Sequence, residues 1–298
     1  MKLTETEFVL LDVETCNPND PQVIELAGLR FVAHRPLEAD HFKETFIYPN
    51  MKIDPTTQSV HHIGDDDVVN APLLSEVDEE WGQWVADRTI IAYNSDFDRT
   101  SLRNTSLFHK NWMDAYRASM HFWSLGMENN DGFPLTSLKQ QELRYWLKLP
   151  KIMGDAHRAA ADIQVTAYIL ERIIDKYLDC GHPDDYDSFV AFIEGPIFHD
   201  TLPLGGRPYQ GKRVHEVEDW ALKKAFDPDN DMHEGFKKFN MLDCLLPEYI
   251  SRFGHTPQQA PKPRKKAPKL TDGVVISAPF KPASSPPKPT TGPRWKRS

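Results

Sequence analysis

Two acidic residues lie two positions apart at the end of an apolar segment near the start of the chain. They are Asp12 and Glu14, in the run Phe-Val-Leu-Leu-Asp-Val-Glu at residues 8–14. On a β-strand both carboxylates would project from one face, with Leu11 and Val13 on the other. Neighbouring carboxylates are costly to bury unless a cation neutralises them, and hard divalent metals prefer such oxygen ligands. Acids at strand ends are also often merely solvated, so this pair alone indicates a metal site only weakly.

Two more acids stand where they could join this pair. Asp98 follows an apolar segment at the point where a strand gives way to a helix, although Asp96 or Asp98 could simply cap that helix. Asp162 begins a helical pattern with apolar or small side chains at i+3, i+4, i+7, i+8 and i+11, which places its carboxylate on the buried stripe. Those positions are Val165, Thr166, Ile169, Leu170 and Ile173.

A histidine precedes Asp162 by five residues. At about 100° per residue on a helix, His157 would point well away from Asp162, so we place it in the loop before the helix. It could act there as a general base, or it could be a loop residue without a role. Four acids and one histidine fit phosphodiester hydrolysis assisted by two metal ions, with His157 accepting the proton of the attacking water.

The hydrophobic pattern predicts the elements that position these residues. We expect strands at residues 8–14, 24–32, 45–48, 89–93 and 113–115, and helices at residues 73–85, 98–108, 135–147 and 158–178. Three strands in an antiparallel meander, followed by strands alternating with helices, indicate an α/β domain with a mixed sheet. This domain, residues 1–182, ends near the helix-stop signal Gly-His-Pro at residues 181–183.

Two further regions follow this domain. Residues 188–254 are long enough for a small second domain and contain a Gly-rich turn at residues 204–212. Lys212 and the backbone of that turn could hold a phosphate, or the turn could be purely structural. Residues 256–298 are rich in proline, lysine and serine and predict a disordered tail, with one apolar island at residues 273–280.

Charge is distributed unevenly between the body and the tail. From Gln258 onward there are ten Lys or Arg and one Asp, a net +9, which leaves −18 for residues 1–257 out of the total of −9. An acidic body is a poor clamp for duplex DNA, so we expect a small metal-charged site, with the tail adding weak attraction to DNA or docking a protein. Three separated cysteines and the lack of a signal peptide or membrane span predict a soluble, cytoplasmic protein.

Together these segments resemble a known family. Asp-Val-Glu-Thr at residues 12–15, Tyr-Asn-Ser-Asp-Phe-Asp at residues 93–98 and His-Arg-Ala-Ala-Ala-Asp at residues 157–162 resemble the three motifs of the DEDD exonuclease superfamily, histidine subtype. That superfamily includes the proofreading subunit of bacterial replicases. Within the superfamily, residues 7–253 are most similar to the exodeoxyribonuclease X group. The likeness includes Cys16, which extends the first motif, and the turn at residues 204–217.

The resemblance implies an RNase H-like fold with a mixed five-stranded sheet flanked by helices. It also implies a Mg²⁺-dependent 3′–5′ exonuclease acting on single-stranded DNA or duplex DNA ends, with two ions held by the four acids and Mn²⁺ as a substitute. One departure is Tyr93, where the family usually has histidine. The implied substrate-binding residues are Thr15, His61, Ile63, Asn94 and Phe97.

Two other functions remain open at this stage. The same five catalytic positions serve exoribonucleases of the superfamily, although those relatives are generally single domains, so the second domain favours DNA. A non-catalytic scaffold that recruits partners through its tail would be expected to have lost one or more acids, and none is missing.

Overall fold

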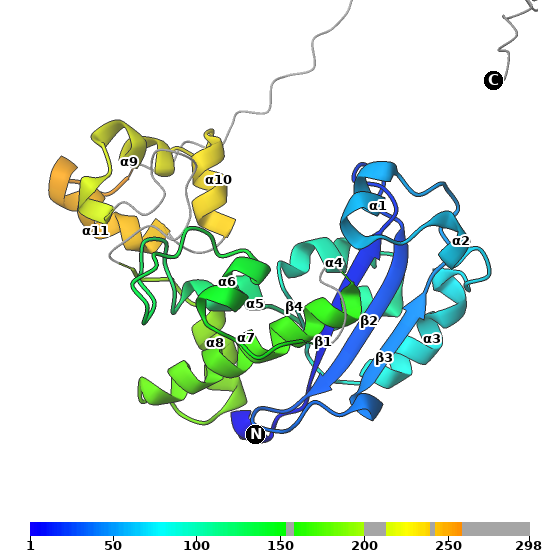
Figure 1. The fold of residues 1–298 in the computed structure, drawn as a ribbon. Coiled ribbons are helices and arrows are strands. Elements are labelled where there is room, and N and C mark those ends of the chain that lie inside the picture. Colours follow the sequence, from blue (N-terminus) through cyan, green and yellow to red (C-terminus); the bar gives the residue numbers. More distant parts are fainter. Residues whose placement is uncertain (153–157, 200–212, 239–241, 258–298) are drawn as a thin grey trace, which may run out of the picture. The chain divides into compact units, whose positions relative to one another are not determined.

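The chain folds around one mixed β-sheet (Figure 1). The structure, a computed structural model, describes residues 1–152, 158–199, 213–238 and 242–257. Within them, five strands lie in the order β3-β2-β1-β4-β5, which confirms the mixed five-stranded sheet. The strands are β1 (Phe8–Thr15), β2 (Val23–Phe31), β3 (Phe42–Phe46), β4 (Ile90–Ala92) and β5 (Trp112–Asp114).

The pairing of the strands decides which strand ends meet. β1 and β2 pair antiparallel, with Glu14 opposite Glu25, and β2 pairs antiparallel with β3. β1, β4 and β5 run parallel to one another, with Leu10 beside Ile91. The carboxyl ends of these three strands therefore lie at one edge of the sheet, where α4 begins after β4 and α5 after β5.

Helices cover both faces of the sheet (Figure 1). The long helix α7 lies across β1 and β2 on one face, and α3 packs on the opposite face. The helices of residues 1–199 are α1 (Pro55–His61), α2 (Asp65–Val68), α3 (Leu74–Val85), α4 (Ser95–Ser101), α5 (Ala115–Met120), α6 (Gln140–Trp146), α7 (Ala159–Asp179) and α8 (Tyr186–Glu194). Short 3-10 turns occur at Leu3–Glu5, Ala39–His41 and Ser106–His109.

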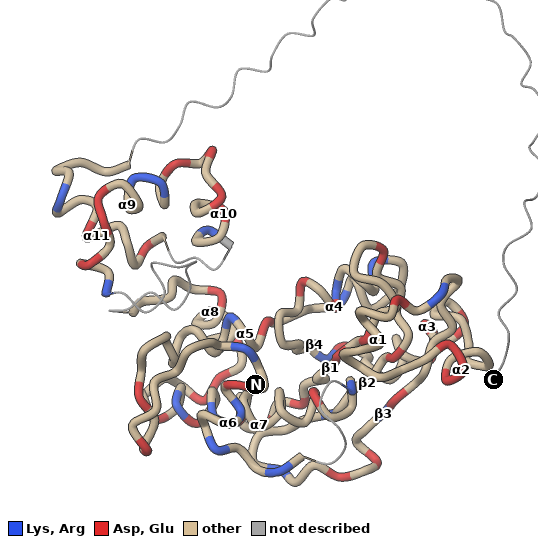
Figure 2. Tube along the Cα trace, turned by 45° about the horizontal axis from the view of Figure 1, so that its top comes forward, with Lys and Arg blue, Asp and Glu red and all other residues tan. Residues whose placement is uncertain are grey.

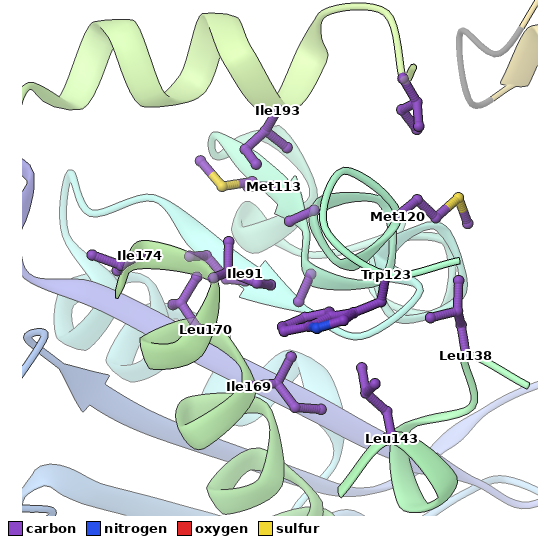
Figure 3. Close-up of a cluster of buried hydrophobic side chains, with 14 of the residues drawn as sticks. Ile91, Met113, Met120, Trp123, Leu138, Leu143, Ile169, Leu170, Ile174 and Ile193 are labelled. Carbon is purple, nitrogen blue, oxygen red and sulfur yellow. The ribbon is translucent and has the colours of Figure 1, made fainter. Parts of the chain in front are cut away.

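Alternation along β1 divides the core in two. Phe8 and Leu10 pack into the larger cluster on the α7 side, whereas Val9, Leu11 and Val13 pack against the α3 side. Figure 3 shows the larger cluster, in which the indole of Trp123 lies among side chains from several helices. The labelled side chains include Leu143 of α6, Ile169 and Leu170 of α7, and Leu138 from the segment before α6.

Helix α3 approaches the sheet closely over a glycine. A Cβ atom added at Gly28 on β2 would come within 2.7 Å of the Trp84 ring and 2.9 Å of the Trp81 ring. Glycine therefore lets the two tryptophans of α3 lie directly on the strand. Their rings meet edge to face with centroids 5.4 Å apart.

Three predicted elements have different bounds in the structure. The third strand is Phe42–Phe46 rather than residues 45–48, because it continues the ladder beside β2 until the chain leaves the sheet at Tyr48, whose N–H bonds the carbonyl of Pro72. The predicted helix at residues 98–108 is two elements, α4 and the turn Ser106–His109, with Thr105 extended between them. The helices α1, α2, α5 and α8 were not predicted.

The predicted helix at residues 135–147 begins five residues later, at Gln140. Its expected first turn is instead an extended segment that buries Leu135 and Leu138. The Glu142 carboxylate holds this segment by accepting hydrogen bonds from the backbone N–H groups of Thr136, at 2.9 Å, and Ser137, at 2.7 Å.

Residues 213–257 contribute a further group of helices. They are α9 (Asp219–Ala225), α10 (Asp231–Lys238) and α11 (Leu242–Phe253), with a 3-10 turn at Val214–Glu216. By the density of its contacts the chain divides into Met1–Gln259 and Ala260–Ser298, and a separate small domain at residues 188–254 stays a prediction. The Gly-rich turn with Lys212, and the tail from residue 258 onward, lie outside the described residues.

No helix in the described part of the chain is both long enough and apolar enough to cross a membrane.

Candidate active site

The paired acids of β1 face helix α7. Asp12 and Glu14 continue the alternation of Phe8 and Leu10, so their half-buried carboxylates share one face of the sheet, as predicted, and this face is the one that α7 covers. They stand at the carboxyl end of β1, beside the ends of the parallel strands β4 and β5. The strand therefore delivers both carboxylates to the edge of the sheet where α4 and α5 begin.

Asp98 reaches the same edge from α4. The helix begins at Ser95 after Asn94, which adopts a left-handed backbone with φ of 68° and is the N-cap residue. The alternative that Asp96 or Asp98 caps this helix is therefore wrong. Asp98 is 2% exposed, and its Oδ1 accepts the backbone N–H of Val13 at 3.0 Å, which ties α4 to the strand between the two acids.

Asp162 lies in the first turn of α7 and is buried, as its position on the apolar stripe predicted. Its Oδ1 accepts a hydrogen bond from Gln141 Nε2 of α6 at 2.7 Å. The neighbouring Gln140 donates to the backbone carbonyl of Asp162 at 2.8 Å and to Thr166 Oγ1 at 2.7 Å. Helix α6 is thus attached to the start of α7 by two consecutive glutamines.

The four acids lie within electrostatic reach of one another. Burial raises the pKa of Glu14 to about 8, helped by repulsion from Asp162 and Glu25. Burial also raises the pKa of Asp98 to about 8, although the N–H of Val13 opposes the shift. Burial, followed by repulsion from Asp98 and Glu14, raises the pKa of Asp12 well above its usual range. Such crowding is relieved when a cation binds, so these residue types suit a divalent metal.

A fifth buried acid lies behind this cluster. Glu25 of β2 is fully buried directly opposite Glu14, and it accepts the Nε–H of Arg158 at 3.1 Å and the backbone N–H of Ala159 at 3.0 Å. Burial alone would raise the pKa of Glu25, but these hydrogen bonds lower it. The Arg158 guanidinium also lies 3.4 Å from the exposed carboxylate of Glu44. Glu25 therefore stays charged and anchors the first turn of α7.

Comparison with known proteins supplies the family. Residues 8–170 match the family model RNase_T, described as exonuclease, which is more than half of the chain. The chain belongs to this exonuclease family. DNA polymerase III PolC-type of Staphylococcus aureus is 27% identical over 181 residues, which are 60% of this chain and 12% of that protein. The chain thus spans only about an eighth of the length of this relative.

Two solved structures show weaker likeness. One is Exonuclease X in complex with 5′ overhanging duplex DNA, at 20% identity and a TM-score of 0.47, covering 57% of this chain and 92% of that one. Another is the nuclease domain of 3′hExo, a DEDDh family member bound to rAMP, at 17% identity and a TM-score of 0.47, covering 59% of this chain and 95% of that one.

Membership places this exonuclease in the DEDD superfamily, whose members hydrolyse nucleic acids from the 3′ end and depend on divalent metals. The RNase H-like fold expected from the motifs is confirmed by the family and by the sheet order. The matched residues 8–170 include all three acidic segments.

The predicted general base lies outside the described residues. His157 belongs to residues 153–157, so its role stays a prediction. In the described part of the chain, the one group of three possible metal ligands whose atoms lie within 4.8 Å of one another is Glu38, Asp40 and His41 on the surface. The four predicted ligands of this exonuclease are less closely grouped, so their side chains would have to turn toward a bound ion.

The predicted substrate-binding residues fall into two groups. Asn94 is exposed and Phe97 is 45% exposed at the start of α4, where they can meet a ligand directly. Thr15, His61 and Ile63 are buried. Ile63 packs in a small hydrophobic cluster with Cys16 and Ile24.

His61 is held within its own turn. Its Nδ1 accepts the backbone N–H of Ile63 at 3.0 Å, and its Nε2 is a buried atom without a hydrogen-bond partner. Burial lowers the pKa of this imidazole. Helix α2, which follows, opens with three consecutive aspartates (Figure 2). Because its imidazole is buried and its pKa is lowered, His61 would stay neutral near pH 7, and its substrate-binding role stays a prediction.

The departure at Tyr93 has a structural explanation. The Tyr93 hydroxyl donates a hydrogen bond to the carbonyl of Leu138, and its ring meets Tyr116 edge to face with centroids 5.7 Å apart. Burial raises the pKa of this phenol, so it remains a neutral donor. Tyr93 thereby joins the loop before α4 to the segment that leads into α6.

Sequence reasoning missed Glu25, Arg158 and Gln141. Each acts through a contact between segments distant in the sequence, and each carries a residue type that is ordinarily on the surface. One signal was available for Glu25, because it interrupts an apolar run, Val23 to Leu29, in which it is the one charged residue. A charged residue in a strand that is buried on both faces requires a partner.

Proposed function

We propose that this chain is a Mg²⁺-dependent 3′–5′ exodeoxyribonuclease that removes nucleoside 5′-monophosphates from DNA 3′ ends. The observation that carries the proposal is the convergence of four acids from β1, α4 and α7, with the pKa of both Glu14 and Asp98 raised to about 8. Carboxylates crowded together in this way are stabilised when a cation binds. Enzymes of this family use divalent cations to hydrolyse a phosphodiester.

The residues fit a metal site in donor type and in charge. Asp12, Glu14, Asp98 and Asp162 supply only carboxylate oxygens, which suit Mg²⁺ better than a softer metal. With four carboxylates, two divalent ions would balance the charge of the cluster. When bound, the ions supply charge neutralisation at the phosphate and a lowered pKa for the attacking water.

The protein's own groups account for the remaining steps. In this proposal the His157 imidazole accepts the proton of the attacking water while a new P–O bond forms and the P–O3′ bond breaks. The terminal nucleotide leaves with the phosphate at its 5′ position, and the shortened strand keeps a 3′ hydroxyl. Asn94 and Phe97 contact that nucleotide from the start of α4, while Thr15, His61 and Ile63 shape the floor beneath it.

The choice of DNA rests on the relatives and on chain organisation. The polymerase relative copies DNA by its printed name, and residues beyond the matched 8–170 leave room for a second domain such as that of the exodeoxyribonuclease X group. An exoribonuclease is the second candidate. The four acids act on the phosphodiester, which DNA and RNA share, so they do not distinguish a deoxyribose from a ribose. A basic tail at residues 257–298 would add general attraction to DNA in this proposal.

The sugar preference can be measured directly. We expect the protein to shorten a 3′-labelled DNA oligomer at least about 10-fold faster than an RNA oligomer of the same sequence, a difference of about 1.4 kcal/mol in activation free energy. The comparison uses Mg²⁺, with EDTA as the blank. Faster loss of the RNA would replace the proposal by the exoribonuclease alternative, and no Mg²⁺-dependent loss of either would remove both.

The acid cluster also predicts how stability depends on pH. Because the folded pKa of Glu14 and Asp98 is raised to about 8, the metal-free fold is favoured while these carboxyls are protonated, and that stability is lost as the pH rises through about 8. We therefore expect the melting temperature in EDTA to fall between about pH 5 and about pH 8, and excess Mg²⁺ to remove most of the fall. A fall that Mg²⁺ leaves unchanged would contradict metal binding by these acids.

A further inference from the structure

Gln141 occupies a position between a buried cation and a carboxylate of the proposed metal site. Its Oε1 accepts from Arg144 Nη1 at 3.3 Å, and its Nε2 donates to Asp162 Oδ1 at 2.7 Å. Arg144 lies on the same helix, three residues on, and is 9% exposed. The side chains form a row of two hydrogen bonds that ends on Asp162.

The chemistry of the partners fixes the orientation of the amide. An arginine can only donate, so the atom facing Arg144 must be the amide oxygen, and the NH₂ group is left to face the carboxylate. The alternative amide orientation would place a donor against a donor and an acceptor against an acceptor. Gln141 is therefore held at both ends, and it presents one N–H to one chosen oxygen of Asp162.

We infer that Gln141 is a positioning residue for Asp162 in metal binding. The inference rests on the proposed function, because it assigns Asp162 as a metal ligand. By occupying Oδ1, the amide fixes the rotation of the carboxylate and so the direction of its second oxygen. Groups that orient a ligand in this way commonly change metal affinity by about 10- to 100-fold when they are removed.

The adjacent glutamine gives a matched control. Gln140 also contacts Asp162, but through the backbone carbonyl, and it contacts the side chain of Thr166. Both glutamines lie in the first turn of α6, both are half-buried, and both join α6 to α7. A purely structural role predicts similar effects from replacing either one, whereas a positioning role predicts a specific effect of Gln141.

The test compares Gln141→Met with Gln140→Met in the full chain. Calorimetric titration with Mg²⁺ alone should give a dissociation constant raised at least about 10-fold for Gln141→Met and changed less than about 3-fold for Gln140→Met. The Mg²⁺ concentration at half-maximal nuclease rate should shift in the same direction. Melting temperatures in EDTA report any structural loss, which should be similar in the two variants.

Unchanged Mg²⁺ binding in Gln141→Met, or equal weakening in Gln140→Met, overturns the inference while leaving the proposed function intact. If the unaltered protein binds no Mg²⁺ and shows no Mg²⁺-dependent nuclease activity, the proposed function itself fails.

Discussion

Replacing Asp12 with asparagine should lower the nuclease rate at least about 1000-fold and, in the metal-free protein near pH 8, should raise the melting temperature. The rate falls because one metal ligand is lost, and metal stabilisation of the reacting phosphate amounts to several kcal/mol. The melting temperature rises because burial and repulsion from Asp98 and Glu14 oppose the charge on Asp12, and asparagine removes that charge while keeping the shape. A lower rate together with a higher melting temperature is the result expected for an acid that serves function. Replacing an acid that stabilises the fold would lower the melting temperature instead.

The matched control for this change is Asp66→Asn. Asp66 is exposed on α2, away from the buried cluster, so neither the rate nor the melting temperature should change measurably. Rates are followed with a 3′-labelled oligomer in excess Mg²⁺, and melting temperatures in EDTA. Full nuclease activity in Asp12→Asn would show that another site or a contaminant is responsible. Lower stability of the metal-free variant would contradict the repulsion among the acids.

Replacing Arg158 with methionine should lower the free energy of unfolding by about 2 kcal/mol near pH 8, less than the loss from a fully buried ion pair because the Arg158 side chain is 34% exposed. The variant leaves Glu25 fully buried beside Glu14, where the N–H of Ala159 and the side chain of Glu44 still bond it but no cation among the described residues faces it. The pKa of Glu25, which is lowered in the unaltered protein, should rise in this variant. The loss should therefore shrink as the pH falls and Glu25 becomes protonated. Urea denaturation at two pH values measures this difference.

The double variant Glu25→Gln with Arg158→Met tests the cause. Because it removes the unpaired buried charge, it should regain part of the stability lost in Arg158→Met alone. Arg103→Met, at an exposed arginine, should be nearly neutral. If the two changes at Glu25 and Arg158 simply add, the two residues are not coupled, and anchoring of α7 by this pair is wrong.

The acids could be predicted from the sequence because their positions depend on local periodicity. Asp12 and Glu14 follow the alternation of a strand, and Asp162 follows the apolar stripe of a helix, so one pattern fixes each carboxylate's direction. The role of Asp98 was harder to predict, because any acid near the start of a helix could act as its N-cap. The structure decides against capping, since Asn94 takes the left-handed N-cap position and Asp98 instead accepts the N–H of Val13.

The supporting residues could not be predicted because their partners are distant. Glu25 and Arg158 are separated by 133 positions, and their pairing follows from how α7 crosses β2. Gln141 was hidden for a further reason. Extending the helix back to residue 135 assigned the wrong first turn, whereas the bonds from Thr136 and Ser137 to Glu142 make Gln140 the start.

The resemblance added residues that the patterns alone did not identify, and burial refines what it implied. His61 and Ile63 were expected to touch the terminal nucleotide, but both side chains are at most 2% exposed. Their contact with a nucleotide stays a prediction, and it requires this loop to open or the contact to be made by the backbone. Asn94 and Phe97 are already accessible at the start of α4.

The order of the elements along the chain has a consequence for protein synthesis. β1 carries two acids, α4 the third and α7 the fourth, and Glu25 of β2 bonds the first turn of α7. A growing chain emerges from the ribosome N-terminal end first, at about 5–20 residues per second. The acids of β1 are therefore synthesised many seconds before Asp162. No chain shorter than 162 residues contains all four acids. A nascent chain that ends before Asp162 therefore lacks one of the four proposed metal ligands.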